Sequence, residues 1–247
     1  MNTEARVLPP DATSPDKLWY DTEGTDQIKV SPENLNQARK YFDTYSRLLQ
    51  AHFSERTDVR SLELGAGSCS LSALISKLPC IGQVCCQDIS LRKMNTLAPQ
   101  VFDLAGADIA KAQFHEGDFG QGLPFDSASY DIILFDAALH HSRNLWLTLS
   151  DCKRVLAKGG LLIAQREQYL ATWTANAKIK KLLNEEVVKA GVSENAYLKC
   201  QYDYYMRVCG FDPMFLPVSE NPLQTLLRPL NGKVFSKWVI YATPVPA

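Results

Sequence analysis

Short apolar runs alternate with longer helical stretches through the middle of this 247-residue chain. The alternation is typical of repeated βαβ units and predicts a parallel sheet. We expect the turn Lys158-Gly159-Gly160 to close the last helix of the series, because glycine accommodates the left-handed conformation found at helix ends. The predicted strands are Val59 to Leu64, Gly82 to Gln87, Ala112 to His115, Tyr130 to Phe135 and Gly160 to Ala164, and the predicted helices are Ser70 to Leu78, Leu91 to Ala105 and Leu145 to Leu156.

The segments on either side of this alternation have other patterns. The first 18 or so residues carry three prolines among small polar residues and predict a flexible lead-in that ends at Trp19 and Tyr20. Ser31-Pro32-Glu33 then predicts a helix start, with serine as the N-cap and an amphipathic helix to about Phe53. After Ala164 we expect helices over Asn176 to Ala190 and Gln201 to Cys209, and strands over Phe211 to Val218 and Val234 to Thr243.

Together these elements predict an α/β fold with a doubly wound, mostly parallel, seven-stranded Rossmann-like sheet and an N-terminal helical cap. We expect residues 1–56 to form the tail and cap. Residues 57–247 form the main domain, with an insertion at about 167–210.

Composition excludes few function classes but favours some over others. Lys and Arg number 26 against 27 Asp and Glu, so the net charge of −1 favours no nucleic-acid partner. The seven cysteines show no C-x-x-C pair and indicate reduced, mostly buried thiols. Because no apolar run approaches the roughly 18 residues of a membrane span, and the N-terminus lacks a signal-peptide layout, we expect no membrane association and a cytoplasmic location. Nothing in the sequence indicates an oligomeric state.

A glycine turn follows the first predicted strand at Gly65 and Gly67. In a doubly wound sheet, ligands bind beyond the carboxyl ends of the strands, and glycines let a ligand approach the backbone closely. Asp88 follows Gly67 by 21 residues, where a carboxylate can accept hydrogen bonds from a ribose diol. A nicotinamide-dependent oxidoreductase would share these features. Glu63 favours S-adenosylmethionine (SAM) instead, because a carboxylate beside the turn repels a pyrophosphate but suits a cationic sulfonium.

Several segments between about Val59 and Ala164 resemble the class I SAM-dependent methyltransferases in order and spacing. The resemblance implies that SAM is bound by motif I, by the acidic residue at the second strand end and by the segment after the third strand. Cys69 stands where many family members carry a third glycine. The matching segments are Glu63-Leu64-Gly65-Ala66-Gly67, Asp88-Ile89, Gly117-Asp118-Phe119, the fourth-strand region from Tyr130 to His141, and Lys158-Gly159-Gly160.

Methyl transfer is an in-line displacement at an activated sulfonium, so the enzyme chiefly aligns the reactants. A base is needed only if the acceptor must lose a proton, and His140 and His141 are our candidates, with a slight preference for His140. The alternative is that neither abstracts a proton and the pair shapes the loop. Asp136 is predicted to bind the methionine part of SAM or the acceptor. We expect no metal, since Leu161 to Arg166 carries no carboxylate before Glu167.

Acceptor binding is expected in the N-terminal segment and the insertion, where aromatic side chains gather. Tyr20, Arg166 and Tyr197 are the leading candidates, although such aromatics equally suit a helical lid. Glu194-Asn195-Ala196-Tyr197, with the later Gly210-Phe211 step, loosely resembles methyltransferases associated with bacterial glycan biosynthesis.

We therefore predict transfer of the SAM methyl group to an oxygen of a small molecule, with a saccharide or glycolipid precursor first. The alternatives are an NAD(P)-dependent oxidoreductase and a methyltransferase acting on nucleic acid or protein. Ala137-Ala138 after Asp136 departs from the signature of amino-methyltransferases and disfavours base amino groups.

Overall fold

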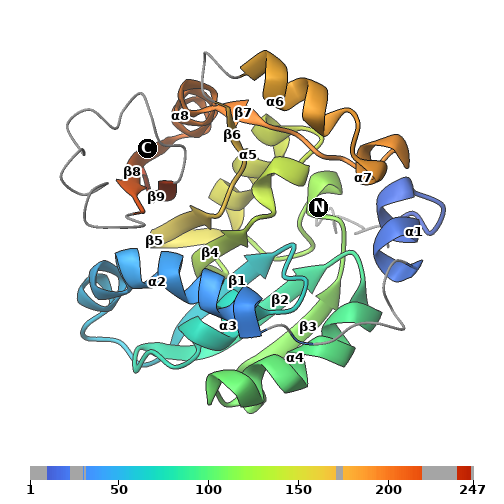
Figure 1. The fold of residues 1–247 in the computed structure, drawn as a ribbon. Coiled ribbons are helices and arrows are strands. Elements are labelled where there is room, and N and C mark those ends of the chain that lie inside the picture. Colours follow the sequence, from blue (N-terminus) through green and yellow to red (C-terminus); the bar gives the residue numbers. More distant parts are fainter. Residues whose placement is uncertain (1–9, 23–29, 31, 171–174, 219–237, 246–247) are drawn as a thin grey trace, which may run out of the picture.

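Seven strands form one sheet in the order β3-β2-β1-β4-β5-β9-β8 (Figure 1). The computed structural model describes residues 10–22, 30, 32–170, 175–218 and 238–245. Neighbours from β3 to β5 run parallel, while β9 pairs antiparallel with both β5 and β8. The predicted doubly wound, mostly parallel sheet is confirmed. Its strands are β1 Val59–Leu64, β2 Ile81–Asp88, β3 Ala112–Glu116, β4 Tyr130–Asp136, β5 Leu156–Gln165, β8 Phe211–Pro217 and β9 Trp238–Pro244.

Helices cover both faces of this sheet, and a small parallel pair of two-residue strands, β6 Tyr169–Leu170 and β7 Tyr197–Leu198, lies outside it. The α-helices are α1 Pro15–Thr22, α2 Pro32–His52, α3 Ser70–Ile75, α4 Leu91–Ala105, α5 Leu145–Val155, α6 Ala175–Leu182, α7 Glu186–Lys189 and α8 Lys199–Val208. Short 3₁₀ turns are η1 Ile109–Lys111, η2 Phe119–Gln121 and η3 Leu139–His141. None of the helices in the described ranges is both long and apolar enough to cross a membrane.

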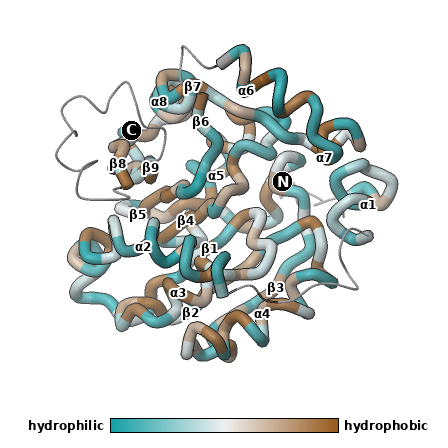
Figure 2. Tube along the Cα trace, in the orientation of Figure 1, coloured by the Kyte–Doolittle hydropathy of each residue, from teal (hydrophilic) through white to brown (hydrophobic). Residues whose placement is uncertain are grey.

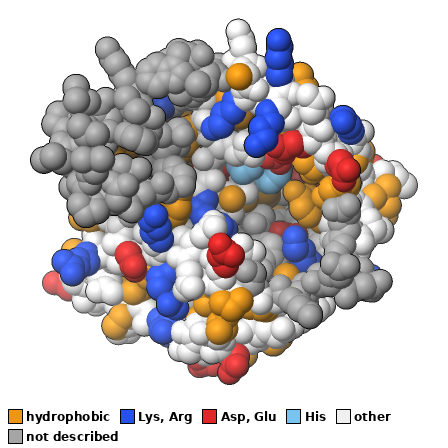
Figure 3. Space-filling view, viewed as in Figure 1, with side chains coloured by type: hydrophobic (Ala, Val, Ile, Leu, Met, Phe, Trp, Pro, Cys, Tyr) orange, Lys and Arg blue, Asp and Glu red, His pale blue; other side chains and the backbone are white. Residues whose placement is uncertain are grey.

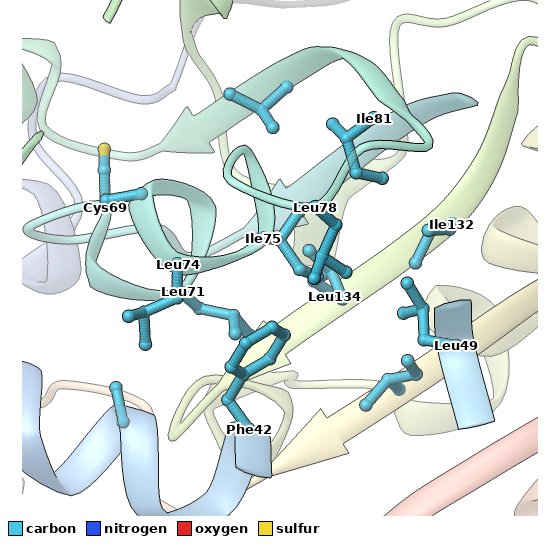
Figure 4. Packing of buried hydrophobic residues seen from close by; sticks show 14 of the residues in the cluster. Phe42, Leu49, Cys69, Leu71, Leu74, Ile75, Leu78, Ile81, Ile132 and Leu134 are labelled. Carbon is cyan, nitrogen blue, oxygen red and sulfur yellow. The ribbon is translucent and has the colours of Figure 1, made fainter. Parts of the chain in front are cut away.

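The core has two halves because successive side chains of a strand point to opposite faces of the sheet. On β4, Ile132 and Leu134 pack with α2, α3 and α4, whereas Ile133 and Phe135 pack with α5 and α8. Figure 2 shows the resulting brown, apolar strands between helices of mixed colour. Figure 4 shows the first half from close by, with Phe42 of α2 directed toward the residues of α3. Burial on both faces explains why these strands read as nearly continuous apolar runs.

The expected flexible lead-in is wrong from Pro15 onward, because α1 begins there. The Ser14 hydroxyl accepts a hydrogen bond from the Lys17 backbone N–H at 3.2 Å, and Pro15 takes the first helical position. The same serine-proline start predicts α2, so the sequence also carries a start signal for α1. The N-cap residue expected for α2, Ser31, lies outside the described residues.

The end of the alternating region also differs from the prediction. α5 ends at Val155 and β5 begins at once at Leu156, so Lys158-Gly159-Gly160 does not close the helix. Gly159 has a φ of 75° and lies where the register between β4 and β5 shifts, which marks a bulge inside the strand. The helix expected over 176–190 is divided into α6 and α7. The predicted start of the last strand, Val234, lies outside the described residues.

Candidate active site

A cavity of about 250 Å³ opens where the carboxyl ends of β1, β2 and β4 meet. Parallel strands bring their carboxyl ends to one edge of the sheet, so the loops that follow them share this space. Figure 3 shows the pale blue histidine surface in the hollow of this face. The wall consists of Asp16, Tyr20, Gly65, Ala66, Gly67, Ser68, Asp88, Ile89, Lys93, Gly117, Asp118, Phe119, Asp136, Ala137, Ala138, His141, Arg143, Arg166 and Ser193.

The glycine turn after β1 forms the floor beside β2. Gly65 has a φ of +68°, and a Cβ there would lie 2.7 Å from the Cβ of Ala138. Gly67 has a φ of +52° but no atom within 4 Å of such a Cβ, so its backbone faces open space. The Gly67 N–H donates to Oδ2 of Asp88 at 2.7 Å, and the Ser90 N–H donates to Oδ1 at 2.9 Å. The Asp88 carboxylate therefore holds the turn against the end of β2.

Glu63 does not reach the cavity wall. Its side chain is buried, and Oε2 accepts hydrogen bonds from the Ser72 backbone N–H at 2.8 Å and the Ser72 hydroxyl at 2.5 Å. The carboxylate thus satisfies a free N–H in the first turn of α3, whose N-cap Cys69 makes no side-chain cap. Burial, followed by the charge of Asp136, raises the pKa of Glu63 to about 8.

Asp136 at the end of β4 forms a bidentate ion pair across the cavity edge. Its Oδ1 and Oδ2 accept hydrogen bonds from Nε and Nη2 of Arg166 at 2.5 and 2.8 Å. Ala137 and Arg166 have φ angles of 55° and 58°, which non-glycine residues rarely adopt. Cys69, in place of the family's third glycine, has a φ of 61°. Two strained positions, Ala137 and Arg166, therefore line this cavity, and Cys69 is a third, next to the lining residue Ser68.

His140 lies behind the wall, between two carboxylates. Its Nδ1 is 2.7 Å from Oε2 of Glu167, and its Nε2 is 3.4 Å from Oε1 of Glu194. Burial disfavours the charged imidazolium, but Glu167 and Glu194 outweigh burial and raise the pKa of His140 to about 9. A buried imidazole that keeps its proton near neutral pH is poorly suited to abstract another, so our hypothesis for the proton acceptor moves to His141.

His141 is the member of the pair on the cavity wall. Its Nδ1 lies 2.6 Å from the Ser193 carbonyl oxygen and 3.2 Å from Oε2 of Glu194. An Nδ1–H that donates to this carbonyl leaves the lone pair on Nε2. The ring of Tyr20 meets the His141 ring edge to face, with 6.1 Å between centroids. Burial and the charges of Glu194 and Asp88 raise the pKa of Tyr20, so its phenol stays neutral.

Helix α1 contributes Asp16 and Tyr20 to the cavity wall and makes polar contacts with segments far away in sequence. Asp16 accepts hydrogen bonds from the Arg143 guanidinium and from the Ser193 backbone N–H. Lys17 forms an ion pair with Glu116 at the end of β3. Figure 1 shows α1 beside α7, which precedes this Ser193 loop.

The structure brings most of the predicted site residues to one cavity. Those on the wall are Tyr20, Gly65, Ala66, Gly67, Asp88, Ile89, Asp118, Phe119, Asp136, His141 and Arg166. Glu63, Leu64 and His140 are buried behind it, and Tyr197 packs against the ring of Tyr202. Sequence reasoning missed Asp16, Lys93, Arg143, Ser193 and the buried Glu167. No spacing pattern marks them, because they reach the site through tertiary contacts.

Comparison with known proteins decides which ligand this arrangement serves. Residues 62–164, which carry the glycine turn, Asp88, Asp118, Asp136 and the histidine pair, match the family model described as a methyltransferase domain. Residues 62–164 of this chain form a methyltransferase domain. The nicotinamide oxidoreductase alternative is therefore wrong. No curated protein matches the sequence well enough to count as a relative of this methyltransferase.

Solved structures show the same fold at low sequence identity. A Haloferax volcanii protein in complex with the Trm112 methyltransferase activator has a TM-score of 0.61 at 16% identity, covering 87% of this chain and 93% of that one. A SAM-dependent methyltransferase from Aquifex aeolicus has a TM-score of 0.56 at 16% identity, covering 88% and 100%. The trans-methyltransferase CalH in complex with SAH has a TM-score of 0.58 at 18% identity, covering 85% and 59%.

The cavity of the methyltransferase suits SAM in shape and in charge. Gly67 leaves open space at the turn, and Asp88 on the wall is the group that would hold the ribose hydroxyls. Within the described residues, Arg166 is paired with Asp136 and Arg143 with Asp16, whereas Asp88 and Asp118 form no ion pair with Lys or Arg. The wall thus keeps negative charge that favours a cationic sulfonium. When bound, SAM supplies an electrophilic methyl group.

Proposed function

We propose that this methyltransferase moves the SAM methyl group to a hydroxyl oxygen of a small molecule, with a saccharide or glycolipid precursor as the leading acceptor. The observation that carries the proposal is the position of His141 on the cavity wall, beside Glu194. A group that assists proton removal is needed only when the acceptor must lose a proton, as a hydroxyl does. We place the loss of that proton at the His141 end of the cavity.

The surroundings of His141 support a polar acceptor. Asp16, Arg143 and Ser193 line the same cavity, and Tyr20 adds an aromatic ring with the Lys93 ammonium 5.1 Å from its centroid. A saccharide combines hydroxyl groups, which pair with such polar side chains, with an apolar face that packs on an aromatic ring. An acceptor without polar groups would leave this wall unsatisfied.

A nucleic acid or a protein is the other acceptor class that the fold allows. The net charge of −1 does not favour a polyanion. A steep loss of acceptor affinity between low and moderate salt would favour a polyanion instead.

A cytoplasmic location remains a prediction from the sequence.

The test uses the purified chain and SAM with a labelled methyl group. We expect label in monosaccharides or lipid-linked sugars, and the chemical shift of the methyl carbon should identify an O-methyl ether. Label that enters only RNA or peptide, or that appears as an N-methyl or C-methyl group, would contradict the proposal.

His141→Ala should lower turnover about a hundredfold or more, because the cavity loses the side chain that assists proton removal. SAM affinity should be retained, since the glycine turn and Asp88 are untouched. The matched control is His52→Ala, because His52 contacts the Gly159 carbonyl near the start of β5, at the other end of the sheet. Equal turnover in the two variants would remove His141 from the mechanism.

A further inference from the structure

Three side chains with metal-binding atoms converge beside the cavity. One ligand atom from each of His140, His141 and Glu194 can be chosen so that all three lie within 4.8 Å of one another. His140 Nε2 is 3.4 Å from one carboxylate oxygen of Glu194, and His141 Nδ1 is 3.2 Å from the other. The two imidazole rings lie side by side, with centroids 4.4 Å apart. Both rings therefore direct a nitrogen toward the same carboxylate.

The two distances from the histidines to Glu194 are close to those between neighbouring ligands of a small divalent cation. Zinc binds imidazole nitrogen and carboxylate oxygen at about 2.0 to 2.2 Å, which places neighbouring ligands of a tetrahedron about 3.4 Å apart. Ligand atoms as far as 4.8 Å apart would have to draw closer together to reach that arrangement. The cation would replace the present hydrogen bond between His141 Nδ1 and the Ser193 carbonyl. With the cation bound, His140 gives up the proton on Nε2, and His141 carries its proton on Nε2 and acts as a ligand in place of the proton acceptor.

A second layer of contacts fixes the ligands in place. The Glu167 side chain is fully buried, lies 2.7 Å from His140 Nδ1, and also accepts the backbone N–H groups of Ala138, Leu139 and His140. A carboxylate on the second ring nitrogen is the usual support of a metal-bound histidine, because it fixes the tautomer and orients the other nitrogen. Asn195 donates to the His140 carbonyl at 2.9 Å and so holds the segment of Glu194 against η3.

We propose that His140, His141 and Glu194 bind a divalent transition-metal cation of the zinc class, with Glu167 as the partner that orients His140. Two histidines and one carboxylate suit such cations and leave coordination positions open. Because His141 lines the cavity, an open position can face the acceptor. The sequence argument against a metal considered only the end of β5, whereas the ligands come from η3 and from the loop before β7.

The role of the cation in methyl transfer rests on the proposed function, whereas the binding of the cation does not. A hydroxyl oxygen bound to a cation loses its proton to water more readily. Its lone pair then forms the O–CH₃ bond while the C–S bond breaks and leaves its electron pair on sulfur. The products are the methyl ether, S-adenosylhomocysteine and a proton.

The experiment measures metal binding directly on the full chain. Cys200 is the exposed free cysteine in the described part of the chain and could bind zinc adventitiously, so every protein carries Cys200→Ser. After treatment with chelator, Zn²⁺ is titrated by calorimetry and Co²⁺ by its visible absorption. We expect one equivalent of each cation to bind, at least tenfold weaker in Glu194→Gln, and 10 to 100-fold weaker in Glu167→Gln. His52→Ala should bind like the parent.

Thermal unfolding and SAM binding will show that the variants are folded, and Glu194→Gln changes neither the size nor the shape of the side chain. The proposal is overturned if no stoichiometric cation binds, if Glu194→Gln binds like the parent, or if His52→Ala loses affinity equally. O-methyl transfer that persists in chelator without bound metal would overturn this inference alone. Stoichiometric metal with no O-methylated product would overturn the proposed function instead.

Discussion

Gly65 and Gly67 share a positive φ but have different surroundings. A Cβ on Gly65 would collide with Ala138 in the loop after β4, so the absent side chain is what lets two loops of the site touch. A Cβ on Gly67 would meet no protein atom within 4 Å. The first glycine therefore serves the fold, and the second leaves room for a ligand.

Gly65→Ala should lower the free energy of unfolding by about 1 to 3 kcal/mol, because overpacking and the left-handed backbone both act against it. Gly67→Ala should cost only the backbone strain, roughly 1 kcal/mol, yet weaken SAM binding. Urea unfolding and calorimetry with SAM separate these effects. Adding Ala138→Gly should restore part of the stability of Gly65→Ala, and no rescue would show that the clash is not the cause.

Asp88 binds two backbone N–H groups and also lies on the cavity wall. Asp88→Ala should weaken SAM binding by roughly 1.5 to 3 kcal/mol through the loss of charge-assisted hydrogen bonds to the ribose. 5′-Methylthioadenosine, which keeps the ribose, should lose affinity as much as SAM does. Unchanged affinity for both ligands in a folded variant would contradict the ribose assignment.

At the scale of elements, helix α1 is attached to the site through the hydrogen bonds of Asp16 with Arg143 and Ser193. Asp16→Ala removes the acceptor for Arg143 and for the Ser193 N–H, and should speed amide hydrogen exchange in α1 roughly 5- to 150-fold, as expected for a loss of about 1 to 3 kcal/mol. The matched control is Leu18→Ala, since Leu18 on the same helix is 51% exposed. Equal exchange in the two variants would show that Asp16 does not hold α1 in place.

The elements that sequence reasoning predicted well are those whose pattern is set locally. The strands from β1 to β4 and helix α4 were placed to within about two residues, because buried parallel strands and an N-capped helix leave strong periodic signals. The bulge at Gly159 was missed, since a glycine pair after a helix also suits a helix end. The two-residue strands β6 and β7 carry no periodicity at all.

The candidate site also contains residues that the sequence predicts and residues that it does not. Residues directly after strands were predictable, because sheet topology gathers all carboxyl ends at one edge. The partners of the histidine pair were not predictable, because Glu167 and Glu194 follow His140 by 27 and 54 residues in the chain. Glu63 was predicted to bind SAM, but its carboxylate contacts Ser72 and does not line the cavity. The type of a residue can indicate a role in the site before the structure shows which contacts the side chain makes.

For the whole molecule, Glu63 couples folding to pH. Its pKa of about 8 in the folded protein lies above its ordinary value of 4.5, because burial and then Asp136 disfavour the ionised form. Between these values the folded state keeps a proton that the unfolded state has lost, so the free energy of unfolding falls as pH rises, by at most about 1.4 kcal/mol per pH unit. The part of the decline due to Glu63 should begin above pH 4.5 and level off past about pH 8, while His140 adds a decline between its ordinary pKa of 6.5 and its raised pKa of about 9.

Glu63→Gln should remove the Glu63 part of this slope and leave the His140 part, because the amide oxygen can still accept the Ser72 hydrogen bonds but the side chain no longer titrates. Urea unfolding at pH 5.5, 7 and 8.5 measures the pH dependence of the free energy of unfolding. The stability of Glu63→Gln relative to the parent should be greatest at pH 8.5. If the parent and Glu63→Gln show the same pH dependence, the proton is held elsewhere in the core.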